Sequence, residues 1–359
     1  MARDIGIDLG TANILIYLKD RGIILNEPSL VAVDDKSNTV IAVGEKAYKM
    51  LGRTPRDISV IHPLKGGVIA DIAVTEQLLE MFIQKLHLNA FFQKPDILIC
   101  TPTNVTTVEQ KAIIQAAIKC GGHSIYLEEE PKVAAVGVGL DIFSPSGNMI
   151  VDIGGGTSDI AVLSMGATVS SRSIKLAGDD MDHQIMDYIK EKYQLIIGER
   201  TAEAIKMDLG SAIEVEIESD MIVKGRDMTT GLPKTVTIYT NEIYHCLKEI
   251  LDTICEETRL VLEDTPPELA GDIIERGIVV TGGGALIHGI DRMLSDRLQV
   301  PVFLADNPLE SVAIGTGVLL DRIKRERGLF DGFKRLFSSK RIVMNPTANI
   351  FDDEALRKS

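Results

Sequence analysis

The chain has 359 residues, of which 45% are hydrophobic and 25% are charged, and its formal net charge is −14. This charge excludes broad electrostatic attraction to nucleic acid, so no nucleic-acid partner is expected. Its length exceeds what one hydrophobic core usually serves, which predicts two lobes with a cleft between them. Apolar stretches stay shorter than the ~20 residues of a membrane-spanning helix, and the cysteines form no CxxC pair, so we expect a cytoplasmic protein with reduced thiols.

The first predicted element is a strand hairpin near the amino terminus. Apolar runs on either side of Gly10 predict two strands, and Asp8 lies just before the turn. Glycine in such a turn allows positive φ and a close approach of the backbone to a ligand. Taken alone, however, this hairpin is better explained as a plain tight turn.

A helix and an acidic segment come next. Residues 108–119 carry apolar side chains at helical spacing and end at a glycine pair, which predicts a surface-packed helix. A short strand over 125–127 precedes three glutamates at 128–130, and Pro131 favours the start of a helix over 132–139. The glutamates are either a solvated charge run or part of a site, and their position between two apolar elements favours a site.

A second hairpin repeats the pattern of the first. Apolar runs that begin at residue 150 and cover 160–163 lie on either side of the glycines at 154–156, and Asp152 has the same place here as Asp8 in the first hairpin. Plain turns do not explain two such hairpins with matching aspartates. We interpret them as the centres of two copies of one lobe.

A smaller subdomain is predicted within the second lobe. Helical patterns over 186–193 and 201–209 precede it, and another over 243–262 follows it. Between them, residues 213–217 alternate strictly between apolar and acidic, and residues 236–239 are also β-like. These two runs predict a small, half-exposed sheet.

A third glycine cluster follows an apolar run near residue 280. Gly282, Gly283 and Gly284 separate this predicted strand from a helical pattern that continues to residue 298. A strand, a glycine turn and a helix start aim backbone N–H groups and the positive end of the helix at an anion. An acidic protein can hold phosphate in this way.

Four motifs in this order resemble the superfamily of actin, sugar kinases and chaperone ATPases. They are Asp8-Leu-Gly-Thr11, Glu130-Pro131 before a helix, Asp152-Ile-Gly-Gly-Gly-Thr157 and Thr281-Gly-Gly-Gly-Ala285. Further strings, among them Asn26-Glu-Pro-Ser29 and Ile197-Gly-Glu-Arg-Thr-Ala-Glu203, resemble the MreB family of bacterial actins, and residues 127–135 look closest to its Mbl branch. Two positions depart from the family pattern. Gly66 stands where aspartate is usual, and Ala204 stands where arginine is common, which leaves the choice between ATP and GTP open.

The resemblance implies an α/β, actin-like ATPase fold. Two duplicated lobes would each have a β-sheet flanked by helices and a smaller subdomain, with the nucleotide in the cleft between the lobes. The first lobe would comprise a core at residues 1–32 and 66–146 and a small subdomain at 33–65. The second would comprise a core at 147–180 and 243–322 and a small subdomain at 181–242. An amphipathic, basic tail would cover residues 323–359.

The resemblance also implies the residues of a Mg-ATP site. Asp8 and Asp152 would hold Mg²⁺ through water, because two carboxylates that face a triphosphate need a hard cation between them. Glu130 and Thr157 would position the attacking water for slow ATP hydrolysis. The expected nucleotide contacts are Gly10, Thr11, Ala12, Asn13, Gly154, Gly155, Gly156, Thr157, Glu203, Lys206, Gly282, Gly283 and Gly284. For Glu203 and Lys206, which are one helical turn apart, an ordinary exposed ion pair is an equally good explanation.

The family also implies self-assembly, as antiparallel double protofilaments on the inner face of the cell membrane, and other cell-shape proteins as partners. The tail combines apolar residues at helical spacing with Lys and Arg, which predicts a helix that can lie on anionic lipid. The alternative is a last helix that packs on its own lobe. The loop at 88–92 resembles the hydrophobic membrane-inserting loop of the family. The predicted lipid contacts are Phe91, Phe92, Phe333 and Phe337.

Two other functions occur in the same superfamily, and each requires an additional structural feature. A small-molecule kinase would need an acceptor pocket with its own base, and the sequence offers no candidate base beyond the acids already assigned. A chaperone ATPase would need a peptide-binding domain, and about forty residues after Leu320 are too few for one. The kinase is therefore the main alternative to a filament-forming ATPase.

Overall fold

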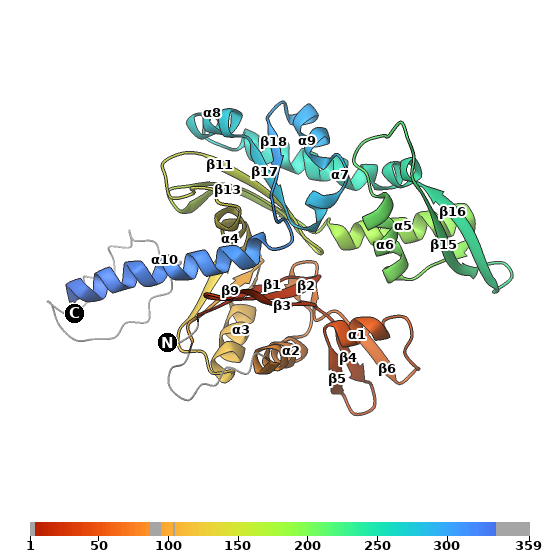
Figure 1. Cartoon of the computed structure of the whole chain (residues 1–359), viewed down its shortest axis with the longest axis horizontal. Coiled ribbons are helices and arrows are strands. Elements are labelled where there is room, and N and C mark those ends of the chain that lie inside the picture. Colours follow the sequence, from red (N-terminus) through yellow and green to blue (C-terminus); the bar gives the residue numbers. More distant parts are fainter. Residues whose placement is uncertain (1–3, 86–94, 103–104, 335–359) are drawn as a thin grey trace.

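The computed structural model describes residues 4–85, 95–102 and 105–334, with side chains as far as residue 326, and it shows two halves (Figure 1). The first half is built on a five-stranded sheet in the order β10-β9-β1-β2-β3. Its strands are β1 (Ile5–Leu9), β2 (Asn13–Leu18), β3 (Gly22–Pro28), β9 (Ile97–Thr101) and β10 (Ile125–Glu129).

The second half repeats this arrangement in a five-stranded sheet of order β13-β12-β11-β17-β18. Its strands are β11 (Asn148–Ile153), β12 (Ser158–Ser164), β13 (Ala167–Ile174), β17 (Ile278–Thr281) and β18 (Val302–Leu304). In each sheet the central strand pairs antiparallel with the next strand of its hairpin and parallel with a later strand. The predicted fold class, two duplicated α/β lobes, is confirmed.

The central strands β1 and β11 are buried along their whole length. This is expected for strands that are covered on both faces of a sheet. Each strand nevertheless has an aspartate, Asp8 or Asp152, as its next-to-last residue. A buried carboxylate costs free energy unless it has a partner, so the carboxyl ends of these two strands are marked as a site.

Two helices, α4 (Glu130–Gly137) and α10 (Ser311–Lys334), lie between the sheets (Figure 1). One hydrophobic cluster joins them to both sheets, through Leu98 of the first and Ile150 of the second. The helices approach so closely that a Cβ added at Gly137 would lie 1.7 Å from the carbonyl oxygen of Ser311. Glycine is therefore required where they cross, and the two halves share one packed centre.

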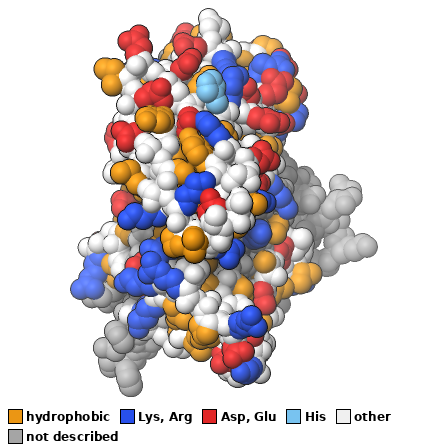
Figure 2. All heavy atoms as spheres, turned by 90° about the vertical axis from the view of Figure 1, so that its right-hand side faces the viewer, with side chains coloured by type: hydrophobic (Ala, Val, Ile, Leu, Met, Phe, Trp, Pro, Cys, Tyr) orange, Lys and Arg blue, Asp and Glu red, His pale blue; other side chains and the backbone are white. Residues whose placement is uncertain are grey.

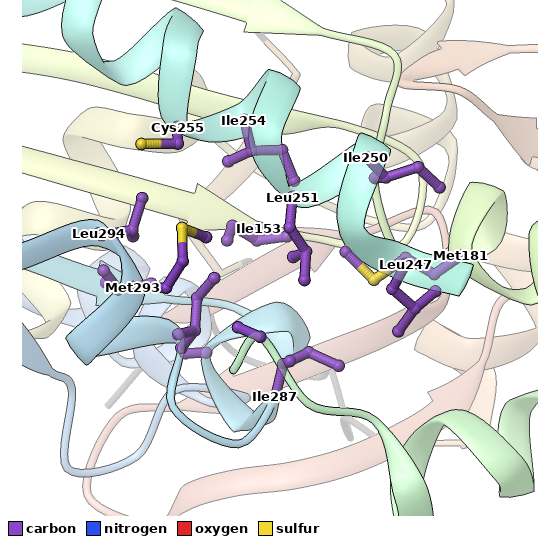
Figure 3. Packing of buried hydrophobic residues seen from close by; sticks show 14 of the residues in the cluster. Ile153, Met181, Leu247, Ile250, Leu251, Ile254, Cys255, Ile287, Met293 and Leu294 are labelled. Atoms are coloured by element: carbon purple, nitrogen blue, oxygen red, sulfur yellow. The ribbon is translucent and has the colours of Figure 1, made fainter. Parts of the chain in front are cut away.

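Six further helices belong to the described parts of the two large lobes and pack around the sheets. In the first half they are α2 (Ile72–Lys85) and α3 (Thr107–Lys119). In the second half they are α5 (Gly178–Tyr193), α7 (Thr240–Glu263), α8 (Pro267–Arg276) and α9 (Ile290–Leu298). Figure 3 shows Leu247, Leu251 and Ile254 of α7 on the side that faces Ile153 of β11. Their spacing of four and three residues is that of one helix face, as the sequence pattern predicts.

Each half also carries a small three-stranded sheet. In the first half it consists of β4 (Val31–Asp34), β5 (Thr39–Val43) and β6 (Ile58–Ile61), next to α1 (Glu45–Met50). In the second it consists of β14 (Leu195–Ile196), β15 (Asp220–Asp227) and β16 (Pro233–Tyr239), next to α6 (Glu199–Leu209). The boundaries given above for the subdomains stay predictions.

Residues 213–217 are not a strand, contrary to the prediction from their alternating pattern. The backbone of Val215 instead forms both of its hydrogen bonds with the side-chain amide of Asn241, its N–H donating to Oδ1 and its carbonyl accepting from Nδ2 (2.9 Å each). A side chain thus takes the place of a neighbouring strand. The strand of this region begins later, at Asp220.

Helix boundaries differ from the expected ones at two further places. Helix α4 begins at Glu130 and ends at Gly137, rather than covering 132–139, and Pro131 lies in its first turn, where a missing N–H costs nothing. After the third glycine cluster only a four-residue 3₁₀ helix, η1 (Gly283–Leu286), follows directly, and α9 begins at Ile290. No long helix therefore starts at these glycines.

Helix α10 runs through residue 323, where the predicted tail begins, without interruption. Its Lys324 forms ion pairs with Asp4 and with Asp96 (2.9 Å to the latter), so this part of the helix is held on the first half. Of the predicted lipid contacts, Phe91, Phe92 and Phe337 lie outside the described residues, and the side chain of Phe333 does too. Within the described residues, no helix has the length and apolar character needed to cross a membrane.

Candidate functional site

The turns of the two hairpins lie against each other. A Cβ added at Gly155 would lie 2.8 Å from the Cβ of Ala12, and one added at Gly156 would lie 2.8 Å from Cγ2 of Thr11. Side chains at these two glycines would push the turns apart. The structure thus brings the predicted contacts of the first hairpin together with those of the second.

The first turn is held by its neighbours in β3 and just beyond. The side-chain amide of Asn13 donates to Oδ1 of Asn26 (3.0 Å), and the N–H of Ser29 donates to the carbonyl of Ala12 (2.8 Å). At Gly10, an added Cβ would lie 2.6 Å from the carbonyl oxygen of Asn13, so only glycine fits this tight turn. The turn is therefore fixed before any ligand binds.

Asp8 and Asp152 lie at the carboxyl ends of the two central strands, next to these turns. They are 7% and 3% exposed. Burial raises the pKa of Asp8 from 3.8 to about 7. The pKa of Asp152 is raised well above its usual range, first by burial and then by the charges of Asp159 and Asp8. Its Oδ2 atom is buried and has no hydrogen-bond partner among the described residues. Both carboxylates would be stabilised by a nearby cation.

Glu130, the first residue of α4, belongs to the same group of acids. Its side chain is enclosed by protein on most sides but keeps some contact with solvent. Burial raises its pKa well above the usual range, and the charges of Asp152, Asp159 and Asp8 add to this. The neighbouring glutamates are not the cause of this shift, and Glu128 is paired with Lys132 (2.9 Å).

Asp159 is a member of this group that the sequence analysis missed. It is 2% exposed and lies opposite Asp152 in the pairing of β11 with β12. Its charge raises the pKa of both Asp152 and Glu130. The hairpin pattern could have identified Asp159, because a turn over residues 154–157 places residues 152 and 159 opposite each other.

A further hairpin, formed by β7 (Leu64–Lys65) and β8 (Val68–Ile69), reaches these turns from the first half. Gly66 and Gly67 form its turn, and both have positive φ (55° and 68°). A Cβ added at Gly67 would lie 2.4 Å from Cγ2 of Thr157, and one added at Gly156 would lie 2.9 Å from the N atom of Gly66. The hairpin thus packs beside Thr157, and this close approach requires glycine at 67 and at 156, whereas a Cβ added at Gly66 would meet only Lys175, at 3.7 Å.

Glu203 and Lys206 lie on α6 and do not form a simple exposed pair with each other. The ammonium of Lys206 donates to the carbonyl of Gly178 and to Oδ2 of Asp182 (2.8 Å each). Glu203 accepts a hydrogen bond from the hydroxyl of Tyr48 (2.9 Å), which belongs to the first half. Lys206 is therefore near the second glycine turn, because the N–H of Gly178 donates to the carbonyl of Gly154 (3.1 Å).

The third glycine cluster packs on the end of β11. A Cβ added at Gly282 would lie 2.4 Å from Oδ1 of Asp152, and one added at Gly284 would lie 2.2 Å from Cγ2 of Ile153. Gly283 has more room, since Leu309 at 3.7 Å is the nearest neighbour of an added Cβ. The cluster is thus placed beside one of the predicted metal-binding aspartates.

The residues present fit a nucleotide with a hydrated divalent cation. Oδ2 of Asp152 is buried without a hydrogen-bond partner among the described residues, and the glycines of the two turns leave no room for side chains between the hairpins. Among the described residues, no three or more His, Cys, Asp or Glu side chains are grouped so as to bind a metal ion directly. Asp8 and Asp152 were predicted to act through water, which does not require such a group.

Comparison with known proteins gives consistent results. The model of the MreB/Mbl protein family matches residues 2–328. The cell shape-determining protein Mbl of Bacillus cereus is 58% identical over 324 residues, which cover 90% of this chain and 97% of the relative. The cell shape-determining protein MreB of Escherichia coli K12 is 45% identical over 332 residues, which cover 91% and 96%.

Solved structures show the same fold. The crystal structure of Spiroplasma citri MreB5 bound to ADP has a TM-score of 0.87 and 41% identity, and covers 91% of this chain and 99% of its own. MreB5 bound to AMPPNP has the same score and identity, with coverage of 92% and 99%. The MamK double helical filament has a TM-score of 0.76 at 20% identity, with coverage of 89% and 99%, and supports the fold alone.

Proposed function

Since this chain belongs to the MreB/Mbl family of bacterial actin-like cytoskeletal proteins, we propose that it binds Mg-ATP between its two halves, hydrolyses it slowly and assembles into membrane-associated filaments that organise cell shape. One observation carries the nucleotide site: two aspartate-bearing hairpins meet turn against turn, and a buried oxygen of Asp152 is left without a partner among the described residues. The MreB5 structures contain ADP and AMPPNP, which supports a nucleotide here.

The proposed cation is Mg²⁺, held through water by Asp8 and Asp152. When bound, Mg²⁺ neutralises charge that develops on the phosphates. Gly10, Thr11, Ala12 and Asn13 on one side, and Gly154, Gly155, Gly156 and Thr157 on the other, would surround the phosphates with N–H and hydroxyl groups. Gly282, Gly283 and Gly284 would approach the nucleotide from the end of β17, and Glu203 and Lys206 from α6.

Hydrolysis is assigned to Glu130 and Thr157. The carboxylate of Glu130 would accept a hydrogen bond, and then the proton, from the attacking water, and the Thr157 hydroxyl would orient that water. The raised pKa of Glu130 supports this role, because a carboxylate that binds its proton more firmly is a better base. A small-molecule kinase is not favoured, since the curated relatives described above are cell shape-determining proteins.

Self-assembly is supported by exposed apolar side chains as well as by the family. Ile217, Ile222 and Leu232, in or near the small sheet of the second half, are 90%, 64% and 65% exposed. Figure 2 shows the face on that side of the molecule, where hydrophobic side chains lie among charged ones. The free energy falls when another surface covers apolar groups that are exposed to this extent. The antiparallel double arrangement of the filaments and other cell-shape partners come from the family resemblance.

Membrane association is proposed at the inner face of the cell membrane, through the tail at 323–359 and the loop around Phe91 and Phe92. Two weak anchors on each subunit would add up within a filament, because later contacts become effectively intramolecular. The continuity of α10 to Lys334 supports a helical start of the tail.

Electron microscopy of the purified protein tests the proposal as a whole. We expect filaments with Mg-ATP, on liposomes that contain anionic lipid, and single particles when EDTA replaces Mg²⁺. Binding of AMPPNP measured by calorimetry in both buffers separates the nucleotide site from assembly. A protein that forms no filaments and binds no AMPPNP in the presence of Mg²⁺ would contradict the proposal.

A further inference from the structure

The small sheets of the two halves touch through α1 and α6. Tyr48 of α1 donates a hydrogen bond from its hydroxyl to Oε2 of Glu203 (2.9 Å), although the residues are 155 positions apart in sequence. The guanidinium of Arg200, also on α6, lies 4.6 Å from the centre of the Tyr48 ring. Both the hydroxyl and the ring of Tyr48 thus contact residues of the second half.

A second contact lies beside the first. Nε2 of His62, just after β6, is 3.7 Å from Oε2 of Glu199, the first residue of α6. Residues 199, 200 and 203 belong to the first two turns of one helix, so the amino-terminal half of α6 faces the first half of the molecule. Figure 1 shows α1 on the side of the small sheet that is turned toward α6.

Helix α6 connects this contact to the proposed phosphate site. One turn after Glu203, Lys206 donates to the carbonyl of Gly178 at the start of α5. There the N–H groups of Gly178 and Asp179 donate to the carbonyls of Gly154 and Gly155 (3.1 and 2.8 Å). A movement of α6 away from Tyr48 would therefore pull on the turn that is expected to surround the phosphates.

We propose that Tyr48, Arg200 and Glu203 form a clasp that holds the two halves together beside the nucleotide site, and that opening of this clasp limits nucleotide release. The inference rests on the proposed function and adds a regulation of the same site. Tyr48 is a positioning residue, since it acts through Glu203 and α6. The clasp is partly exposed, so water can replace its contacts when it opens, which suits a contact that must break in every cycle.

Release of a fluorescent ATP analogue, displaced by excess ATP in a stopped-flow experiment with Mg²⁺, tests the clasp. Tyr48→Phe removes the hydrogen bond and keeps the ring under Arg200, so we expect release about tenfold faster, the usual size for a hydrogen bond to a charged group. Tyr48→Ala removes both contacts and should release faster still. Lys49→Ala, on the same helix with a side chain that is 69% exposed, is the control and should behave as wild type.

A double-mutant cycle identifies the partner. If the clasp acts through Glu203, Tyr48→Phe should accelerate release little further in a Glu203→Met background, in which the hydroxyl of Tyr48 has lost its acceptor. The Tm of thermal unfolding without nucleotide should be lowered by no more than about 2 °C in Tyr48→Phe, as expected for loss of one hydrogen bond, which separates the clasp from a general loss of stability. Release rates of Tyr48→Phe and Tyr48→Ala equal to wild type would overturn the clasp and leave the nucleotide site intact. Failure of the wild-type protein to bind the analogue would overturn the proposed site and the clasp with it.

Discussion

Replacement of Asp152 by asparagine should have opposite effects on the stability of the nucleotide-free protein and on its affinity for Mg-ATP. Asp152 is 3% exposed and its pKa is raised, first by burial and then by the charges of Asp159 and Asp8. Its ionised form therefore destabilises the folded protein near neutral pH. Asparagine has the same shape without the charge, so it removes the repulsion but also a proposed partner of Mg²⁺.

The raised pKa of Asp8 gives the scale of the effect. A change from 3.8 to about 7 means that ionisation of this buried group costs on the order of 4 kcal/mol in the folded state, most of it from burial. Removal of one neighbouring charge relieves only part of such a cost. We expect Asp152→Asn to stabilise the nucleotide-free protein by about 1 kcal/mol, or roughly 1 °C in Tm for a chain of this length, and to weaken Mg-ATP binding at least about tenfold.

Thermal unfolding in EDTA at pH 8 measures the first effect, and calorimetric titration with AMPPNP, with and without Mg²⁺, measures the second. Asp208→Asn is a matched control, because Asp208 lies exposed on α6. It should change neither quantity. An Asp152→Asn protein less stable than this control, or one with wild-type affinity in Mg²⁺, would refute the assignment of Asp152 to a charge-strained cation site.

Three further outcomes are expected. Glu130→Gln should keep nucleotide binding but slow phosphate release by a factor on the order of 100, because the base for the attacking water is lost. A coupled phosphate assay measures this rate, and a rate equal to wild type would show that another group is the base. The nucleotide-free protein should lose stability between pH 5 and pH 8 in thermal unfolding, since burial raises the pKa of Asp8 to about 7 and that of Asp182 to about 6, so the folded state binds more protons than the unfolded state in this range. A stability that does not change between pH 5 and pH 8 would contradict the raised pKa values of Asp8 and Asp182. Replacement of the four predicted lipid contacts by serine should abolish co-sedimentation with anionic liposomes while ATP hydrolysis continues, and undiminished binding would exclude them as anchors. These residues are Phe91, Phe92, Phe333 and Phe337.

Local patterns predicted the elements that depend on local interactions. The helix expected over 108–119 is α3, and its start is fixed by a capping box between Thr106 and Glu109. The two glycine hairpins were predictable because an apolar run, a glycine turn and a second apolar run leave few other structures. The same reasoning failed at 213–217, where the alternation is real but the amide of Asn241 supplies the hydrogen bonds that a strand would need.

The contacts between the halves could not be predicted from local patterns. Tyr48 and Glu203 are ordinary residues on exposed helices until folding brings α1 and α6 together. Gly66 looked like a lost aspartate, whereas in the structure the N atom of this residue lies beside Gly156. Such contacts depend on how the two sheets are oriented around α4 and α10, and this orientation is set by packing over the whole interface rather than by any one motif.

The buried acids explain why nucleotide binding and the closed arrangement should be coupled. Asp8 and Asp152 come from different halves, so their mutual repulsion opposes the approach of the two turns, while the core around α4 and α10 favours it. A cation between them would convert the repulsion into attraction. Mg-ATP at about 100 times its Kd would add about 2.7 kcal/mol to the stability of the state that binds it. The clasp at Tyr48 forms only when the halves are together, so the ligand and the clasp should favour the same state. Loss of the clasp should therefore speed release of the ligand, and loss of the ligand should favour opening of the clasp.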